Sequence, residues 1–274
     1  MIRVEKVCFA YPGKSDLVLK NISLKIRENE FVAIVGRNGS GKSTLARLLN
    51  GSIVPIRGKV WVDDLDTGKP QDRYEIKAKV GLLLPSPDNQ IISNLVEEDV
   101  AFGPENLGLP PAEIRARVNA ALRTVAMEEF AKHPPSLLSG GQKQRVCIAG
   151  ILAMKPKYMV LDEPTSMLDP AGRKEVVNTL VQLNKREKIS LVFITHNLQD
   201  VIRSDRIIVM DKGEVVAEGL TRDIIGECRL LRAAGVEPLD ITDLIESVNQ
   251  FCGTKISKHI VEVNDLVKIL CQFK

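Results

Sequence analysis

The segment "GRNGSGKS" at residues 36–43 constrains the fold of this chain more than any other part of the sequence. It matches the pattern G-x-x-x-x-G-K-[ST], follows the apolar run "FVAIVG" at 31–36 and opens the helical pattern "KSTLARLLNG". Such a pattern is typical of a strand, a glycine-rich loop whose backbone N–H groups face a phosphate, and a helix whose N-terminus favours negative charge. In such a loop Lys42 reaches the β- and γ-phosphates of a nucleotide, and the hydroxyl of Ser43 ligates Mg²⁺. We therefore predict a phosphate-binding loop within an α/β fold.

Further short apolar runs alternate with helical patterns along the chain. "YMVLDE" at 158–163 and "LVFIT" at 191–195 are continuous apolar strands, whereas the first 30 residues and "GKVWVDD" at 58–64 alternate more. Continuous apolar strands between helices indicate a parallel sheet that is buried on both faces, and alternation indicates an antiparallel sheet. We predict a P-loop NTPase (RecA-like) fold of the α/β class, with a mixed sheet and an antiparallel β subdomain.

Two changes of pattern divide the chain. Pro110 and Pro111 open a helix within a segment from about 86 to 156 that predicts a helical insert between strands of the main sheet. After Gly219 the pattern predicts a small, mostly helical C-terminal domain with two amphipathic stripes. Each stripe is either part of the core or an interaction surface. The first stripe consists of Ile241, Leu244, Ile245, Val248 and Phe251, and the second of Leu266, Ile269, Leu270 and Phe273. We expect a nucleotide-binding domain over 1–219 that contains the insert at 86–156, and a tail domain over 220–274 that contacts a dimer mate or another partner.

Composition excludes several classes of function. The chain has 38 basic and 35 acidic residues, a net charge of +3, and only 4% aromatic residues, which argues against a nucleic-acid-binding surface. Its five cysteines include no CxxC pair, which favours free thiols in a reducing cytosol over disulfides or a metal site. The N-terminal segment has no apolar h-region, and no apolar run approaches the roughly 18 residues of a membrane span. We therefore expect any membrane role to come through a partner.

An acidic pair provides the second part of a nucleotide site. Asp162 and Glu163 stand at the carboxyl end of the apolar strand "YMVLDE", the edge of an α/β sheet at which ligands bind. We expect Asp162 to hold Mg²⁺, through water, and Glu163 to polarise the attacking water. Such a pair often only ends a strand, but beside a complete phosphate loop it favours hydrolysis.

A second anion-facing helix start lies in "LLSGGQKQR" at 137–145. Ser139 is predicted as an N-cap, and Gln142 completes a capping box. Gly140 and Gly141 permit close approach of the backbone to an anion. A capped helix by itself is usually structural, so the question is why one chain has two phosphate-facing helix starts.

Four motifs together resemble the ATP-binding cassette (ABC) ATPases. Residues Gly36–Thr44, "LSGGQ" at 138–142, "LDEPTSMLDP" at 161–170 and "THN" at 195–197 appear in the family's order. The resemblance implies a head-to-tail dimer in which the Ser-Gly-Gly of one chain closes the ATP bound to the phosphate loop of the other.

The same resemblance implies roles for individual residues. ATP contacts are expected from Gly36, Asn38, Gly39, Ser40, Gly41, Lys42, Ser43 and Thr44, and from Ser139, Gly140, Gly141 and Gln142 toward the partner's ATP. Ser166–Asp169 would cross the dimer interface, so that Ser166 and Asp169 bound the interface loop. His196 would contact the γ-phosphate, and Tyr11 would lie against adenine, although either residue is also commonly structural.

A narrower resemblance points to importers. "PDNQIISNLVEEDVAFGPENLGLP" at 87–110, "GRKEVV" at 172–177 and the tail ending "LVKILC" are similar to ATPases of energy-coupling factor (ECF) importers of the first ATPase type, and to cobalt and nickel importers. This implies an ATP- and Mg²⁺-dependent subunit at the cytoplasmic face of the membrane, peripheral to it. Its partners would be a second ABC ATPase, a transmembrane scaffold and a substrate-capture subunit. The segment after Asp88 would receive the coupling helices of the scaffold. The alternative is a soluble ABC ATPase acting on protein partners, such as one serving iron–sulfur cluster assembly.

One position departs from the family pattern. After "VG" at 80–81 the family has a glutamine where this chain has Pro85, which offers no side-chain ligand and no N–H. We expect slower hydrolysis at the site that uses this chain's own phosphate loop, unless a neighbouring residue or a water fills the gap. Gln90 is expected to belong to the next helix and not to act as a substitute, whereas the hydroxyl of Ser86 would reach only after a shift of the loop.

Overall fold

The alternating strands near the N-terminus form an antiparallel sheet. The computed structural model describes residues 1–271, and this sheet has the strand order β2-β1-β4-β5. Alternate side chains such as Leu19, Ile22, Leu24 and Ile26 are buried, so one face of the sheet lies on the core. The predicted antiparallel subdomain is confirmed. Its strands are β1 (Ile2–Phe9), β2 (Leu19–Ile26), β4 (Arg57–Val62) and β5 (Leu65–Asp66).

The continuous apolar runs form a second, mainly parallel sheet with the order β10-β9-β3-β8-β7-β6. Strands β9, β3, β8, β7 and β6 run parallel, and β10 pairs antiparallel with β9 at one edge. Every residue of β3, β7 and β8 is buried, as expected for strands that are covered on both faces. The strands are β3 (Phe31–Val35), β6 (Val80–Leu83), β7 (Tyr158–Asp162), β8 (Ser190–Thr195), β9 (Arg206–Asp211) and β10 (Glu214–Leu220).

Helix α1 (Lys42–Leu49) joins the two sheets into one core. Its apolar residues Leu45, Leu48 and Leu49 are fully buried, in one cluster with residues of both sheets. The opposite face of the parallel sheet packs in a second cluster with the helices of the insert, with α6 and with the helices after β10. The phosphate loop that precedes α1 is therefore fixed at its two ends by buried structure.

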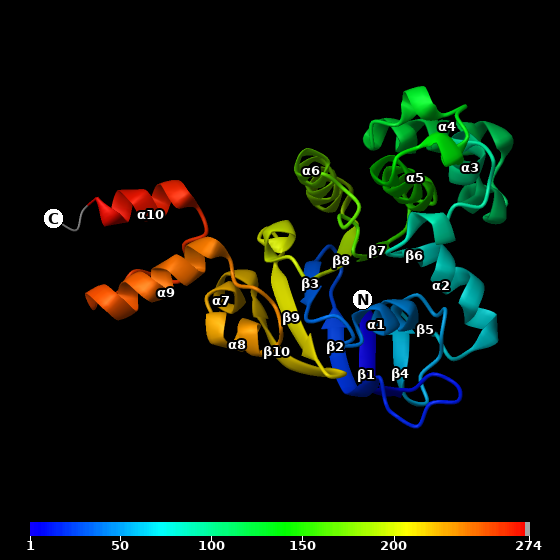
Figure 1. Ribbon diagram of the computed structural model, residues 1–274. Helices are drawn as coiled ribbons and strands as arrows, with labels where there is room; N and C mark the ends of the chain where they lie inside the picture. Colours follow the sequence, from blue (N-terminus) through cyan, green and yellow to red (C-terminus); the bar gives the residue numbers. More distant parts are fainter. Residues whose placement is uncertain (272–274) are drawn as a thin grey trace.

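Between β6 and β7 the chain is helical, and Figure 1 shows α3, α4 and α5 gathered at one side of the molecule. The predicted proline-initiated helix is present as α4 (Pro111–Thr124), and the signature segment opens α5 (Gly140–Ala153). Short 3-10 turns connect these helices because several connections begin with proline. The other elements here and in the body of the chain are η1 (Pro70–Asp72), α2 (Arg73–Lys79), η2 (Pro87–Asn89), α3 (Val96–Asn106), η3 (Glu128–Phe130), η4 (Pro135–Leu137), α6 (Pro170–Glu187) and η5 (Leu198–Val201).

Residues 221–271, after β10, contain four helices, and α9 and α10 extend away from the sheets on the side opposite the insert (Figure 1). The first predicted stripe is divided: Ile241 and Ile245 are buried, whereas Leu244 and Phe251 are exposed. In the second stripe Leu266 is buried, and Phe273 lies outside the described residues. The helices are α7 (Thr221–Ile225), α8 (Cys228–Ala233), α9 (Asp240–Cys252) and α10 (Val263–Leu270). Within residues 1–271, none of the helices has the length and apolar character to cross a membrane.

Candidate active site

The glycine-rich loop connects the end of β3 to the first turn of α1, as the sequence predicts. Gly41 is the N-cap of α1 with a φ of 99°, and a Cβ there would lie 2.7 Å from Leu19 Cδ2. Only glycine adopts this left-handed conformation without strain and leaves room for Leu19. The first N–H groups of a helix have no partner within the helix, so this end of α1 is suited to binding an anion.

Lys42 is folded back over its own loop. Its Nζ donates hydrogen bonds to the carbonyl oxygens of Gly36 at 2.6 Å and Arg37 at 2.9 Å. Burial lowers the pKa of Lys42, while Glu163 and Asp162 act in the opposite direction. The buried ammonium is thus stabilised by carbonyl dipoles and by two carboxylates, which is the environment that a bound phosphate would share.

Asp162 lies at the carboxyl end of β7, where the sequence places it, and is 1% exposed. Burial raises the pKa of Asp162, and the nearby Ser43 hydroxyl offsets this only in part. Its Oδ1 atom has no hydrogen-bond partner within the described part of the chain. A buried carboxylate oxygen without a partner, close to a serine hydroxyl, fits Mg²⁺, which takes oxygen ligands and often only one or two carboxylates. Ser43 and Asp162 are therefore the candidate metal ligands.

The structure brings Glu163 and His196 together from neighbouring strands. Glu163 follows β7 with a φ of 51°, and its N–H donates to the carbonyl of Ile194 on β8 at 2.9 Å. His196 follows β8, and its Nδ1 lies 2.9 Å from Glu163 Oε1. Because parallel strands end at the same edge of the sheet, both side chains lie where Asp162 also ends its strand. A carboxylate held by an imidazole at this edge is suited to orienting a water molecule.

The remaining predicted contacts near the loop are placed as follows. The hydroxyl of Tyr11 lies 3.1 Å from Thr44 Oγ1, so this half-buried aromatic ring lies beside the first turn of α1. Ser40 Oγ is buried without a hydrogen-bond partner among the described residues, whereas Asn38 and Gly39 are exposed. Tyr11 therefore lies beside the phosphate loop, although the two are about 30 residues apart in the sequence.

The signature segment begins α5 with the predicted capping box. The N–H of Gln142 donates to Ser139 Oγ at 3.3 Å, and the N–H of Ser139 donates to Gln142 Oε1 at 2.8 Å. A Cβ on Gly141 would lie 2.9 Å from Leu168 Cδ2, so this helix start packs on the 166–169 loop. Within one chain the signature thus contacts the predicted interface loop, and it lies on a helix of the insert and not beside α1 (Figure 1).

The interface loop is held by a hydrogen bond at each end. Ser166 Oγ donates to the backbone carbonyl of Glu163 at 3.0 Å, so the start of the loop is tied to the main chain of the candidate catalytic residue. Asp169 is the N-cap of α6 and accepts a hydrogen bond from the N–H of Gly172 at 3.1 Å. The exposed loop is therefore anchored at the catalytic edge of the sheet and at a helix start.

Comparison with known proteins identifies this arrangement. Residues 19–166 match the ABC transporter family. The chain belongs to that family. The P-loop NTPase fold and ATP hydrolysis, both predicted from the motifs, are thereby confirmed, and nucleotide binding with them.

Relatives over the full length of the chain narrow the assignment. The ATP-binding protein EcfA of the energy-coupling factor transporter from Syntrophomonas wolfei is 48% identical and covers 100% of both chains. The corresponding EcfA1 of Caldanaerobacter subterraneus is 46% identical over 99% of each chain. The resemblance to ECF ATPases is confirmed, and the alternative of a cassette serving iron–sulfur assembly is not favoured.

Solved structures agree with the sequence relatives. The cbiO1 structure from Clostridium perfringens, described as part of the ABC transporter complex cbiONQ, has a TM-score of 0.76 and 36% identity, and covers 89% of this chain and 98% of that one. The dimeric post-hydrolysis structure of the ATP-binding cassette MJ0796 bound to ADP and phosphate has a TM-score of 0.74 and 31% identity, over 81% and 99%. The fold described above is therefore that of an ABC cassette.

Gln90 corrects one expectation. It does not belong to the next helix: it directly follows the 3-10 turn η2, and α3 begins only at Val96. Its Oε1 accepts from the N–H of Leu84 at 2.9 Å, and its Nε2 donates to the carbonyl of Leu82 at 3.1 Å. Since β6 is an edge strand, these backbone groups have no neighbouring strand to bond with. The amide of Gln90 provides their hydrogen-bond partners. The turn that begins at Pro87 is the sequence signal that brings residue 90 back to the strand.

Beside Gln90 the cassette has a groove of about 360 Å³. It is formed by the end of β6, by α3 and by α5, and its walls include Leu82, Ile92, Phe102 and Cys147. Ile92 and Phe102 are large apolar side chains that remain exposed. The segment after Asp88 therefore provides an apolar recess on the surface of the insert.

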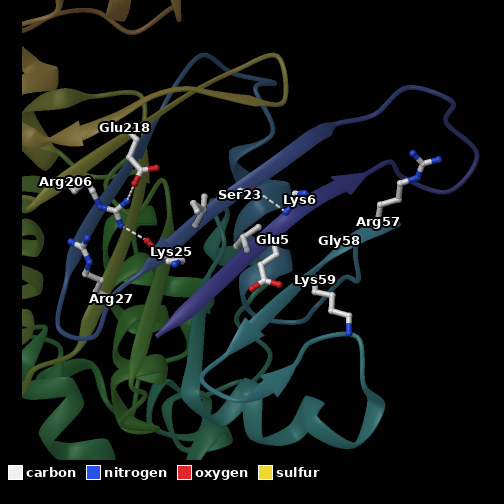
Figure 2. Close-up of a pocket in the computed structure, with 12 residues that line it drawn as sticks. Glu5, Lys6, Ser23, Lys25, Arg27, Arg57, Gly58, Lys59, Arg206 and Glu218 are labelled. Carbon is white, nitrogen blue, oxygen red and sulfur yellow. Dashed lines mark hydrogen bonds and ion pairs between the residues drawn. The ribbon is translucent and has the colours of Figure 1, made fainter.

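A separate cavity of about 950 Å³ lies on the outer face of the antiparallel sheet (Figure 2). Basic side chains of three strands project there, among them Lys6, Lys25 and Lys59. Arg206 at its edge is already paired with Glu30 and Glu218. None of the motif residues lines this cavity, so within residues 1–271 the chemistry lies at the edge of the parallel sheet and not here.

Proposed function

We propose that this chain is the ATP-hydrolysing subunit that powers an ECF-type importer for vitamins or transition-metal ions. It would work as one half of a head-to-tail pair of cassettes at the cytoplasmic face of the membrane. The observation that carries the proposal is the arrangement of two helix starts. The phosphate loop opens α1, and the capped signature segment opens α5 on the insert, in contact with the exposed 166–169 loop. Two such chains placed head to tail would complete each other's sites.

Each site would combine residues of both chains. One chain would contribute Tyr11 against adenine, Lys42 to the β- and γ-phosphates and the loop N–H groups. The other would contribute Ser139, Gly140, Gly141 and Gln142, with Ser166 and Asp169 bounding the loop that crosses the interface. Ser43 and, through water, Asp162 would hold Mg²⁺, which would offset the negative charge of the phosphates when bound.

Hydrolysis would depend on the pair at the sheet edge. Glu163 would polarise the attacking water, and His196, 2.9 Å from it, would contact the γ-phosphate and hold the carboxylate in position. Pro85 stands where the family has a glutamine, and Gln90 has both ends of its amide engaged by Leu84 and Leu82. The site that uses this chain's phosphate loop would therefore hydrolyse ATP slowly, while a second ATPase with the glutamine would provide a faster site.

The groove beside Gln90 would receive the coupling helices of a membrane scaffold, which in turn would hold a substrate-capture subunit. Its apolar walls and its position on the insert support this assignment. We also propose the division into a cassette over 1–219, with its insert at about 86–156, and a tail domain over 220–274.

The test is copurification of the tagged full-length chain from gently solubilised membranes. A scaffold membrane protein together with a second ATPase is the expected result. Ile92→Asp should abolish scaffold recovery, because Ile92 lines the groove and is 61% exposed. Ile56→Asp is the matched control, since Ile56 is 60% exposed but lies outside the groove. Recovery of only non-membrane proteins would overturn the importer assignment and leave the ABC ATPase intact.

A further inference from the structure

Arg37 connects the phosphate loop to the helices that follow the cassette. Its backbone N–H donates to the carbonyl of Ala234 at 3.1 Å, and its guanidinium Nη2 donates to the carbonyl of Ala233 at 3.0 Å. Its Nε lies 3.0 Å from Asp211 Oδ1 at the end of β9. A variable position of the glycine-rich motif is thus fixed by residues nearly 200 positions later in the chain.

The carbonyl groups that Arg37 contacts are left free by the way α8 ends. Gly235 has a φ of +70°, and its N–H donates to the carbonyl of Arg232 at 3.0 Å. The N–H of Val236 donates to the carbonyl of Leu231 at 2.9 Å. This is a Schellman motif, which satisfies the carbonyls of Leu231 and Arg232. The carbonyls of Ala233 and Ala234 remain for another donor. Arg37 supplies two donors, its backbone N–H and its Nη2.

The carbonyl of Arg37 then connects this contact to the catalytic lysine. It accepts hydrogen bonds from Lys42 Nζ at 2.9 Å and from the N–H of Ser40 at 3.2 Å. A displacement of Arg37 would move the acceptor that positions Lys42. Arg37 therefore contacts both the end of α8 and the ammonium group of Lys42.

The same segment of the tail also faces the other end of the site. A cavity of about 450 Å³ is lined on one side by His196 and Gln199 and on the other by Gly235 and Asp240. The segment that joins α8 to α9 thus borders both the phosphate loop, through Arg37, and the segment that carries His196.

We propose that Arg37 is a positioning residue through which the tail domain sets the conformation of the phosphate loop, and with it the affinity for nucleotide. This inference rests on the proposed role of the loop in binding ATP phosphates. Because coupling free energies are reciprocal, bound nucleotide also stabilises the docking of the α8 end on Arg37. The arrangement and contacts of the tail domain thereby regulate ATP binding to the phosphate loop of this chain.

The first variant of the test changes the tail and leaves the sequence of the phosphate loop unaltered. In Gly235→Ala the new Cβ would lie 2.9 Å from Arg37 Cβ and 3.2 Å from Arg37 Nε. Gly253→Ala is the matched control, because Gly253 has nearly the same φ of +66° and a Cβ there meets nothing within 4 Å. Both variants place alanine in a left-handed conformation, and only Gly235→Ala introduces a steric clash with Arg37.

The readout is the dissociation constant of a fluorescent ATP analogue with Mg²⁺, measured on the full-length chain, together with kcat and KM for ATP. We expect Gly235→Ala to raise the dissociation constant and KM about three- to tenfold, as for loss of one or two hydrogen bonds, with kcat little changed. Gly253→Ala should leave all three within about twofold. Arg37→Ala should raise the dissociation constant about as much as Gly235→Ala does. The double variant should bind the ATP analogue no more weakly than either single variant.

Each outcome decides the proposal. Equal affinity in Gly235→Ala and Gly253→Ala, or additive effects in the double variant, would overturn the inference while leaving the nucleotide site in place. Absence of nucleotide binding by the unaltered chain would overturn the assignment of the site itself. Thermal unfolding of the two glycine variants verifies that they differ in affinity and not in folding.

Discussion

The side-chain amide of Gln90 accepts a hydrogen bond from the backbone N–H of Leu84 at 2.9 Å, immediately before Pro85. The same amide donates to the carbonyl of Leu82, so Gln90 extends the hydrogen bonding of edge strand β6 past its last residue. Both ends of this amide are therefore held by the backbone of β6 and of the residue that follows it. Position 85 itself therefore determines whether the cassette has a glutamine at its phosphate site.

Pro85→Gln is expected to raise kcat for ATP about ten- to a hundredfold at the site that uses this chain's phosphate loop, which corresponds to about 1.4–3 kcal/mol of barrier. The new amide would offer an oxygen ligand and would help to orient water, and phosphoryl transfer depends on such positioning. Single-turnover hydrolysis at saturating ATP measures the change. Pro85→Ala is the control, since it removes the ring without adding an amide. No gain in the glutamine variant, or an equal gain in both, would mean that a neighbouring group or a water already fills the position.

Glu163→Gln is expected to lower the hydrolysis rate at least about a hundredfold and to leave nucleotide affinity nearly unchanged. The amide keeps the shape that allows contact with His196, but it cannot accept a proton from water, and a general base is worth about 10²–10⁴ in rate. ATPase rates and nucleotide titrations separate the two effects. Glu187→Gln, at the end of α6, is the control. A rate within threefold of the unaltered chain would remove Glu163 from its proposed role.

Asp63→Asn is expected to destabilise the fold in a pH-dependent way. Burial alone would raise the pKa of Asp63, but hydrogen bonds from the α-amino group of Met1, from Tyr158 and from Lys157 outweigh it and lower the pKa from 3.8 to about 2. A lowered carboxyl pKa stabilises the fold at pH values above 3.8, and this stabilisation is lost as the pH falls through about 2. After allowance for solvent screening, we expect a loss of about 1–2 kcal/mol in the free energy of unfolding at pH 7.

Urea denaturation followed by circular dichroism at pH 7 and pH 3 measures this difference. The destabilisation should be smaller at pH 3, because Asp63 is partly protonated in the unfolded chain there. Asp64→Asn at the exposed neighbouring position is the control. A destabilisation that is equal at both pH values would show that the ion pairs of Asp63 are not its source.

The cassette fold and the order of its motifs along the chain could be predicted from local sequence patterns. Strands such as Phe31–Val35 are apolar throughout because both faces of the parallel sheet are covered, and this burial is visible in the sequence as a continuous run. The capping box of Ser139 and Gln142 was also predictable, because it depends on residues only three positions apart.

Tertiary structure alone decided the contacts between distant segments. The prediction that Gln90 belongs to the next helix is wrong because its hydrogen bonds go to a strand edge, and an unpaired edge is a property of the assembled sheet. Arg37 occupies a position at which the glycine-rich motif accepts any residue, and its partners at Ala233 and Ala234 follow from how the tail helices dock. The stripe on α9 was divided into buried Ile245 and exposed Phe251 for the same reason. Local periodicity encodes which side chains share a face, but which of them a neighbour covers depends on packing between elements far apart in the chain.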